Sequence, residues 1–126
     1  MRAIVLILCF MAVVSCKKEP KQDFGIPTKE EVAKDPRITA GEKLFKGRGM
    51  CATCHQPDKK VIGPSIKEMV RIYKEQNADM KAFLKGDGEP IVDPDQYEIM
   101  RANLAVTKVM TDDELESIIA YMYSFN

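Results

Sequence analysis

Residues 41–55 read Gly-Glu-Lys-Leu-Phe-Lys-Gly-Arg-Gly-Met-Cys-Ala-Thr-Cys-His, and the last five carry the most information. The 126-residue chain has four cysteines and one histidine, and its 19 basic residues are balanced by 19 acidic ones. A single histidine excludes any site that is built on two imidazoles. The balanced and interspersed charges give no signal for nucleic-acid binding. The length allows one domain of ordinary size.

The run Cys51-Ala-Thr-Cys54-His55 has the C-x-x-C-H form of a haem c attachment site. Two thiols at this spacing can each bond to one vinyl group of a haem, and the adjacent imidazole then serves as the proximal iron ligand. A thioredoxin-like pair needs a βαβ context and a structural zinc site needs four Cys or His ligands, and the sequence indicates neither. A simple Cys51–Cys54 disulfide stays open as an alternative. We therefore predict one covalently bound haem c, held by Cys51, Cys54 and His55.

The rest of the domain is expected to be helical, because no segment shows the sustained alternation of a strand whereas helix signals are frequent. Helix starts are expected at Asp35, at Ser65, near Asn77, at Asp93 and at Thr111. The fourth helix is expected to end near Met100, before an irregular run over 101–109. The last has a capping box, Thr111 with Glu114, and a hydrophobic staple, Met110 with Leu115. The pattern predicts a small all-α domain of about five short helices, with a prosthetic group helping to fill its core.

The N-terminal residues are interpreted as a targeting signal rather than as part of the folded domain. Arg2 precedes twelve uncharged residues, 3–14, and a membrane-spanning helix needs about 20. A positive residue ahead of a short apolar core is typical of a secretory signal. The run ending in Cys16, Val-Val-Ser-Cys, resembles the lipobox of bacterial lipoproteins, which implies a signal peptide over 1–15 and acylation of Cys16. An ordinary secretory signal with an incidental cysteine is the alternative.

Residues 16–35 are then expected to form the lipidated N-terminus and a linker, because this stretch has two prolines before residue 28 and no apolar period. This organisation predicts a protein that is exported to the periplasmic side and anchored by lipid to a bacterial membrane.

The segment 41–55, the run Gly-Pro-Ser over 63–65 and a final helix ending Ile-Ile-Ala-Tyr over 118–121 together resemble class I c-type cytochromes. The likeness is to the small bacterial members with a single haem, and it implies a cytochrome c domain over 36–126. By position, it also implies that Gly41 and Phe45 pack against Ile118 and Tyr121, where the first and last helices of the family cross.

The resemblance further implies that the carbonyl of Pro64 accepts a hydrogen bond from His55 Nδ1. Such a bond fixes the ring and raises its basicity as a ligand. A plain Gly-Pro turn is the alternative role for Pro64.

The resemblance also implies a methionine as the second axial ligand. Of the eight methionines, two lie in the expected signal, one is too close to the attachment loop, and two lie on apolar helix stripes where Met commonly fills gaps. Met80, Met100 and Met110 remain. Residues 97–104, Tyr-Glu-Ile-Met-Arg-Ala-Asn-Leu, are similar to the ligand segment of a subset of these cytochromes. Met100 is therefore expected to bind iron opposite His55, with Met110, Met80 or no protein ligand as the alternatives.

A haem iron closed by His and Met has no open site for a substrate, and a thioether ligand raises its reduction potential. The resemblance then implies an electron carrier and not an enzyme: a monomer with redox protein partners, no nucleic acid and no small-molecule substrate. It would be tethered to the membrane between a quinol-oxidising complex and a terminal oxidase or reductase. An apolar patch at the haem edge, with Lys59 and Lys60 at its rim, is the expected docking surface.

Two other functions are compatible with the residues. The chain could be a haem c subunit of a larger oxidoreductase complex. A peroxidase-like or ligand-sensing haem protein would need an open sixth coordination site, and no second histidine exists to assist it.

Overall fold

The computed structural model describes residues 35–125. The predictions for the signal over 1–15, for Cys16 and for the linker as far as residue 34 lie outside the described residues. The elements are α2 (Pro36–Lys46), η1 (Cys51–Thr53), α3 (Ile66–Glu75), α4 (Met80–Lys85), η2 (Pro94–Gln96), α5 (Tyr97–Thr107) and α6 (Asp112–Tyr123).

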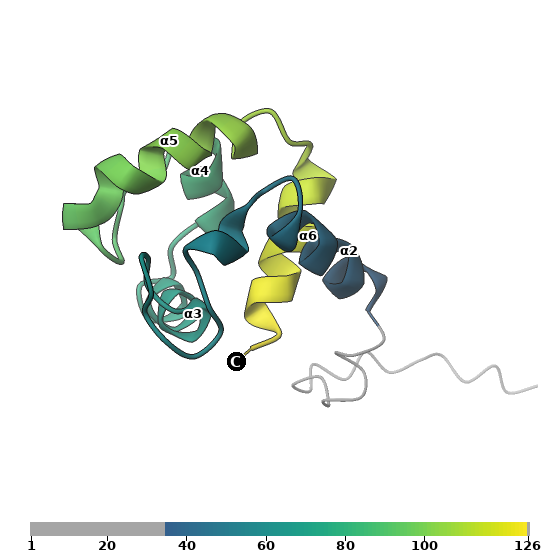
Figure 1. Cartoon of the computed structure of the whole chain (residues 1–126), viewed down its shortest axis with the longest axis horizontal. Helices are drawn as coiled ribbons and strands as arrows, with labels where there is room; N and C mark the ends of the chain where they lie inside the picture. The colour runs from purple at the N-terminus through teal and green to yellow at the C-terminus, as the bar shows by residue number, and fades with distance from the viewer. Residues whose placement is uncertain (1–34, 126) are drawn as a thin grey trace, which may run out of the picture.

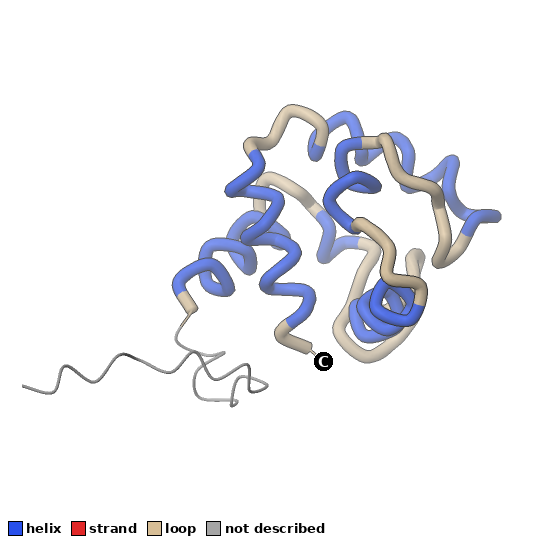
Figure 2. The backbone as a smooth tube through the Cα atoms, turned by 180° about the vertical axis from the view of Figure 1, so that it is seen from behind, coloured by secondary structure: helices blue, strands red, loops and turns tan. Residues whose placement is uncertain are grey.

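Helices joined by loops, with no strand, make up the part of the chain drawn in colour in Figure 2. The prediction of a small all-α domain with about five short helices is confirmed. Over the same range, no helix combines the length and the apolar character that crossing a bilayer requires.

The first and last described helices, α2 and α6, lie side by side (Figure 1). A Cβ atom at Gly41 would stand 1.9 Å from the Ser117 carbonyl oxygen, so only glycine allows the two backbones to come this close. One turn later the Phe45 ring packs against Tyr121, with centroids 5.3 Å apart. Ile118 is 1% exposed in the same core. Helices α3 and α4 then pack against α6 of this crossing pair.

Three of the expected helix starts are confirmed by their caps. The Asp35 carboxylate and the Ser65 hydroxyl each accept a hydrogen bond from a backbone N–H in the following turn, at 2.8 and 3.2 Å. Thr111 and Glu114 form the full capping box, with bonds of 3.2 and 2.9 Å. Each bond satisfies a backbone donor that the first turn of a helix leaves without a partner.

The third helix begins later than expected. Asn77 has a left-handed backbone, with φ of 49°, and so cannot open a helix. Asp79 takes the capping position instead, where its carboxylate accepts a hydrogen bond from the Ala82 N–H at 3.0 Å. The helix runs from Met80 and closes at Gly86, whose φ is 81°.

The fourth helix differs more, because the expected irregular run over 101–109 is wrong. Helix α5 continues as far as Thr107, without a glycine or proline to break it. Leu104 and Thr107 are buried about one turn apart, and the Thr107 hydroxyl donates to the Leu84 carbonyl at 2.5 Å, which ties α5 to α4. Met100 therefore stands in the first turn of the helix rather than near its end.

Candidate functional site

The cysteine pair lies in the short 3-10 helix η1 and the turn that follows it. Met50 enters this turn with a left-handed backbone, φ 50°. The backbone N–H groups of Cys54 and His55 both donate to the Cys51 carbonyl, at 3.1 and 2.9 Å. Cys51 is buried, Cys54 is half-buried, and both are free thiols. The tight turn brings the two thiols and the imidazole to the same wall of the molecule.

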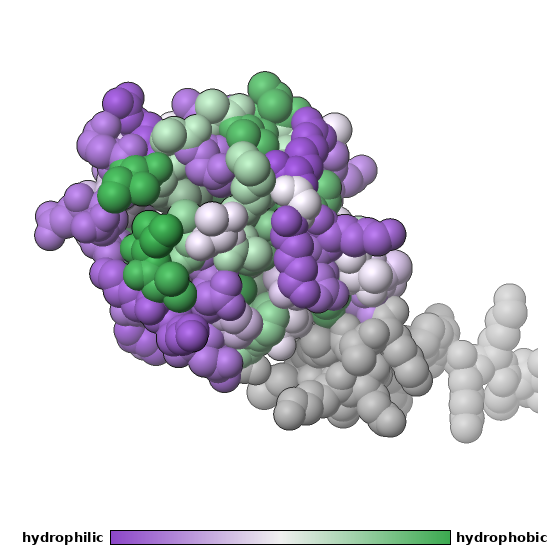
Figure 3. All heavy atoms as spheres, in the orientation of Figure 1, coloured by the Kyte–Doolittle hydropathy of each residue, from purple (hydrophilic) through white to green (hydrophobic). Residues whose placement is uncertain are grey.

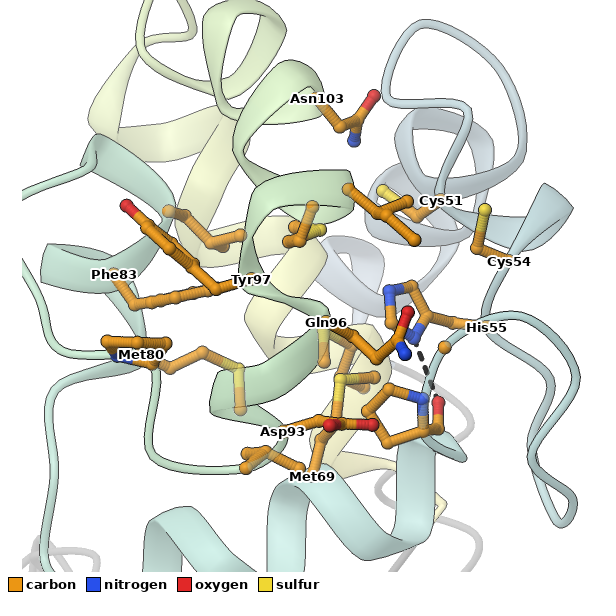
Figure 4. Close-up of a pocket in the computed structure, with 18 of the residues that line it drawn as sticks. Cys51, Cys54, His55, Met69, Met80, Phe83, Asp93, Gln96, Tyr97 and Asn103 are labelled. Carbon is orange, nitrogen blue, oxygen red and sulfur yellow. Dashed lines mark hydrogen bonds between the residues drawn. The ribbon is translucent and has the colours of Figure 1, made fainter.

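The His55 ring is held from one side by the loop that follows it. Its Nδ1 lies 2.8 Å from the Pro64 carbonyl oxygen, the dashed line in Figure 4. Because a carbonyl only accepts, Nδ1 carries the proton and donates, which leaves Nε2 with a lone pair for a metal. The structure thus contains the hydrogen bond that the cytochrome resemblance implies.

Gly63 explains how the loop can lie so close to the ring. A Cβ atom there would stand 2.5 Å from His55 Cε1, so a side chain would push the ring away. Burial lowers the pKa of His55, and the Pro64 carbonyl opposes this in part. Burial therefore favours the neutral imidazole, which is the form that binds metals.

These groups face a cavity of about 310 Å³ whose walls are mainly apolar. Figure 4 shows the labelled side chains around one shared space. Those from the attachment segment are Cys51, Cys54 and His55, those from α4 are Met80 and Phe83, and those from α5 are Tyr97 and Asn103. Pro64 and Met100 also line it, so the five residues expected to hold the haem surround the same cavity.

The methionines fall into two groups. Met100 and Met80 both line the cavity, as do Met50, Met69 and Met122, whereas Met110 is 5% exposed in the core and does not reach the cavity wall. Met100 shares a face of α5 with Tyr97 and Asn103, three residues to either side, and both of these also line the cavity. Of the three candidates left by the sequence, two therefore stand at the cavity.

Asn103 has a position that sequence reasoning missed. Its Nδ2 donates to the Gly49 carbonyl at 3.1 Å, across 54 residues of sequence. The Cys51 thiol lies 3.4 Å from the same oxygen. Asn103 thus fastens α5 to the loop that leads into the cysteines. Its place three residues after Met100 was the only signal in the sequence.

The mouth of the cavity is apolar. Three residues of its lining are exposed hydrophobics: Met50, Ile62 and Ile99, at 57%, 51% and 60%. The face drawn in Figure 3 shows hydrophobic side chains reaching the surface between polar ones. Lys59 and Lys60 are exposed in the loop after His55, and Lys60 pairs with Asp93 at 2.7 Å.

The residues present fit a covalently bound haem. Two free thiols, an imidazole with Nε2 available and an apolar cavity large enough to need filling are the donor set and the environment that such a group requires. In the described residues no cluster of three or more His, Cys, Asp or Glu side chains suggests a different metal site. Fold and site together define a small all-α protein with one haem attached through C-x-x-C-H.

Comparison with known proteins leads to the same class. The family model for cytochrome c matches residues 38–126. The chain is 47% identical over 36 residues to cytochrome c-551 of Azotobacter vinelandii, a match that covers 29% of this chain and 43% of that relative. The chain thus spans less than half the length of this relative. From the family match, the protein belongs to the cytochrome c family, and haem c with its iron is its cofactor.

Proposed function

We propose that the protein is a single-haem electron carrier with His55 and Met100 as the two axial ligands. When bound, the haem supplies a one-electron Fe(III)/Fe(II) couple. The observation that carries the proposal is that the fixed imidazole of His55 and the thioether of Met100 line one apolar cavity from different elements. Two protein ligands would leave no coordination site for a substrate.

The choice of Met100 over Met80 depends on how each is held. Asn103, one turn after Met100, ties α5 directly to the attachment loop. Met80 begins the short helix α4, which is held to α5 by the hydrogen bond from Thr107 to Leu84. A thioether on the helix that is fastened to the cysteine loop keeps a fixed position relative to His55. The bond from Asn103 to the attachment loop therefore favours Met100 as the ligand.

The chain's own residues would then support electron transfer by holding the site rigid and by excluding water from it. Pro64 and Gly63 hold the His55 ring, and the apolar walls keep water out, so the surroundings change little when the charge changes. The exposed apolar residues Met50, Ile62 and Ile99 at the mouth offer redox protein partners a surface at which they can approach the cavity.

We further propose that the protein is exported and anchored through Cys16, as a monomeric, membrane-tethered carrier in a respiratory chain. The support is the apolar run over 3–14 and the lipobox-like residues that end at Cys16. The partners proposed are a quinol-oxidising complex and a terminal oxidase or reductase. A Cys16→Ser chain should lose incorporation of labelled fatty acid and should be released from membranes. Retention of both would contradict the anchor.

The ligand proposal is tested by the absorption spectrum of the purified holoprotein. The oxidised form should be low-spin and should show the far-red charge-transfer band of a methionine ligand. Met100→Ala should abolish this band, whereas Met80→Ala, the matched control at the other candidate methionine of the cavity, should retain it. The reverse result would make Met80 the ligand. A high-spin wild-type spectrum would favour the peroxidase-like or sensing alternatives instead.

A further inference from the structure

The cavity wall carries one formal charge among its described lining residues, and that charge belongs to Asp93. All other lining side chains are apolar, neutral polar or, in the case of His55, neutral in its metal-binding form. The Asp93 side chain is 20% exposed, so this carboxylate is mostly removed from solvent and stands next to an apolar space. A charge in such a place acts over a longer range than a solvated one, because water screens it less.

Asp93 has a specific partner in the loop that follows His55. Its Oδ2 accepts a hydrogen bond from Lys60 Nζ at 2.7 Å, across 33 residues of sequence. The Lys60 side chain is 58% exposed and is not part of the cavity lining. The hydrogen bond to Asp93 raises the pKa of Lys60, which favours its charged form.

The pair also connects the two halves of the site. The backbone of Lys60 pairs with that of His55 in an isolated antiparallel bridge. Asp93 stands just before the 3-10 turn η2 that leads into α5. The ion pair thus joins the loop after the iron-binding histidine to the segment that precedes Met100. Its negative end faces the cavity and its positive end faces solvent.

We propose that Asp93 and Lys60 set the reduction potential of this protein, an inference that rests on the proposed role as an electron carrier. Oxidation of the iron adds one positive charge to the site. The carboxylate of Asp93 stabilises that charge and so lowers the reduction potential, and the ammonium group of Lys60 offsets part of the effect. Neither residue would bind the iron. Both would act on the reduction potential through the electric field in the cavity.

The test is a redox titration of the purified holoprotein followed by absorption. Asp93→Asn should raise the midpoint potential, and Lys60→Gln should lower it, because each removes a charge of opposite sign. Lys60→Arg should keep the midpoint potential of the wild type, since it keeps the positive charge. Asp95→Asn is the matched control: Asp95 is exposed in the same turn and does not line the cavity, so its removal should shift the potential least.

Shifts of the same sign in Asp93→Asn and Lys60→Gln, or no shift in either, would overturn the proposal, because a merely structural pair has no opposite effects on a potential. If Asp93→Asn fails to take up haem, Lys60→Gln and Lys60→Glu decide the matter. Both should lower the potential, Lys60→Glu by more, and an unchanged potential in both would contradict the proposal. A wild-type protein that shows no reversible one-electron couple would instead refute the electron-carrier role itself.

Discussion

The two walls of the haem cavity are held in place by different means. On the histidine wall, residues 51–64 are fixed by close contacts within one short segment, including the backbone bonds to Cys51 and the bond from His55 to Pro64. On the methionine wall, α5 is held by individual hydrogen bonds to distant parts of the chain, such as the one from Asn103 to the Gly49 carbonyl. The geometry of the attachment segment is thus determined by residues close in sequence, whereas the position of α5 depends on tertiary packing.

The largest effect is expected on the histidine wall, when both of its thiols are removed. The double variant Cys51→Ala, Cys54→Ala should yield protein without covalently bound haem, because no thiol of the attachment motif remains. The measurement is the intact mass of the denatured protein together with haem staining on a gel. Covalent haem in the double variant would contradict the assignment of the motif.

The next largest effect is expected at Gly63. In Gly63→Ala the new Cβ would stand 2.5 Å from the His55 ring, and overpacking of this kind costs about 1–3 kcal/mol. The free energy of unfolding of the holoprotein in denaturant measures the loss. Pro64→Ala is the matched control, because it keeps the carbonyl that accepts from His55, and it should cost less. Equal losses in the two variants would contradict the role given to Gly63.

The methionine wall can be loosened at one bond. Asn103→Ala removes the hydrogen bond to Gly49, which we expect to lower the free energy of unfolding by about 1 kcal/mol. In the same variant the far-red methionine band should be lost at a lower denaturant concentration than in the wild type. Arg101→Ala is the control, since Arg101 is exposed and, within residues 35–125, forms its ion pair with Glu98 on the same helix. A band as resistant as that of the wild type would mean that α5 is fastened elsewhere.

The smallest effect is expected at the start of α6, at a residue that does not line the cavity. The Thr111 backbone N–H, and next to it the Arg48 guanidinium, lower the pKa of Glu114 below its usual 4.5. A lowered folded pKa means that the contribution of Glu114 is present above its unfolded pKa and is lost as the pH falls through the folded value. Denaturant unfolding between pH 6 and acid pH should therefore show a steeper loss of stability in the wild type than in Glu114→Gln. Parallel pH profiles would contradict this role of Glu114.

The same contrast explains how much the sequence could predict. The C-x-x-C-H motif and the caps at Ser65 and Thr111 are local patterns, in which a few neighbouring residues determine the geometry. The bond from His55 to Pro64 was implied by the resemblance to c-type cytochromes. The end predicted for this helix near Met100 is wrong, because the burial that extends α5 to Thr107 comes from contacts with α4 that no local sequence pattern indicates.

Residues that act across long sequence distances were likewise missed. Asn103 meets Gly49 and Asp93 meets Lys60 only after the helices have packed. Nothing in the residues adjacent to either pair indicates the contact. The sequence left Met80, Met100 and Met110 as candidate ligands. Only the packed structure shows that Met80 and Met100 line the cavity and that Met110 does not.

The glycine crossing of α2 with α6 has a consequence for the order in which the protein matures. Gly41 meets the carbonyl of Ser117, so this contact cannot form until residue 117 is available. Contacts between such distant residues are also slow to form, because a long loop has to close first. The cysteines, by contrast, are complete as a motif once residue 55 is available. A chain still emerging during synthesis thus presents its thiols and histidine well before α6 can close the domain around them.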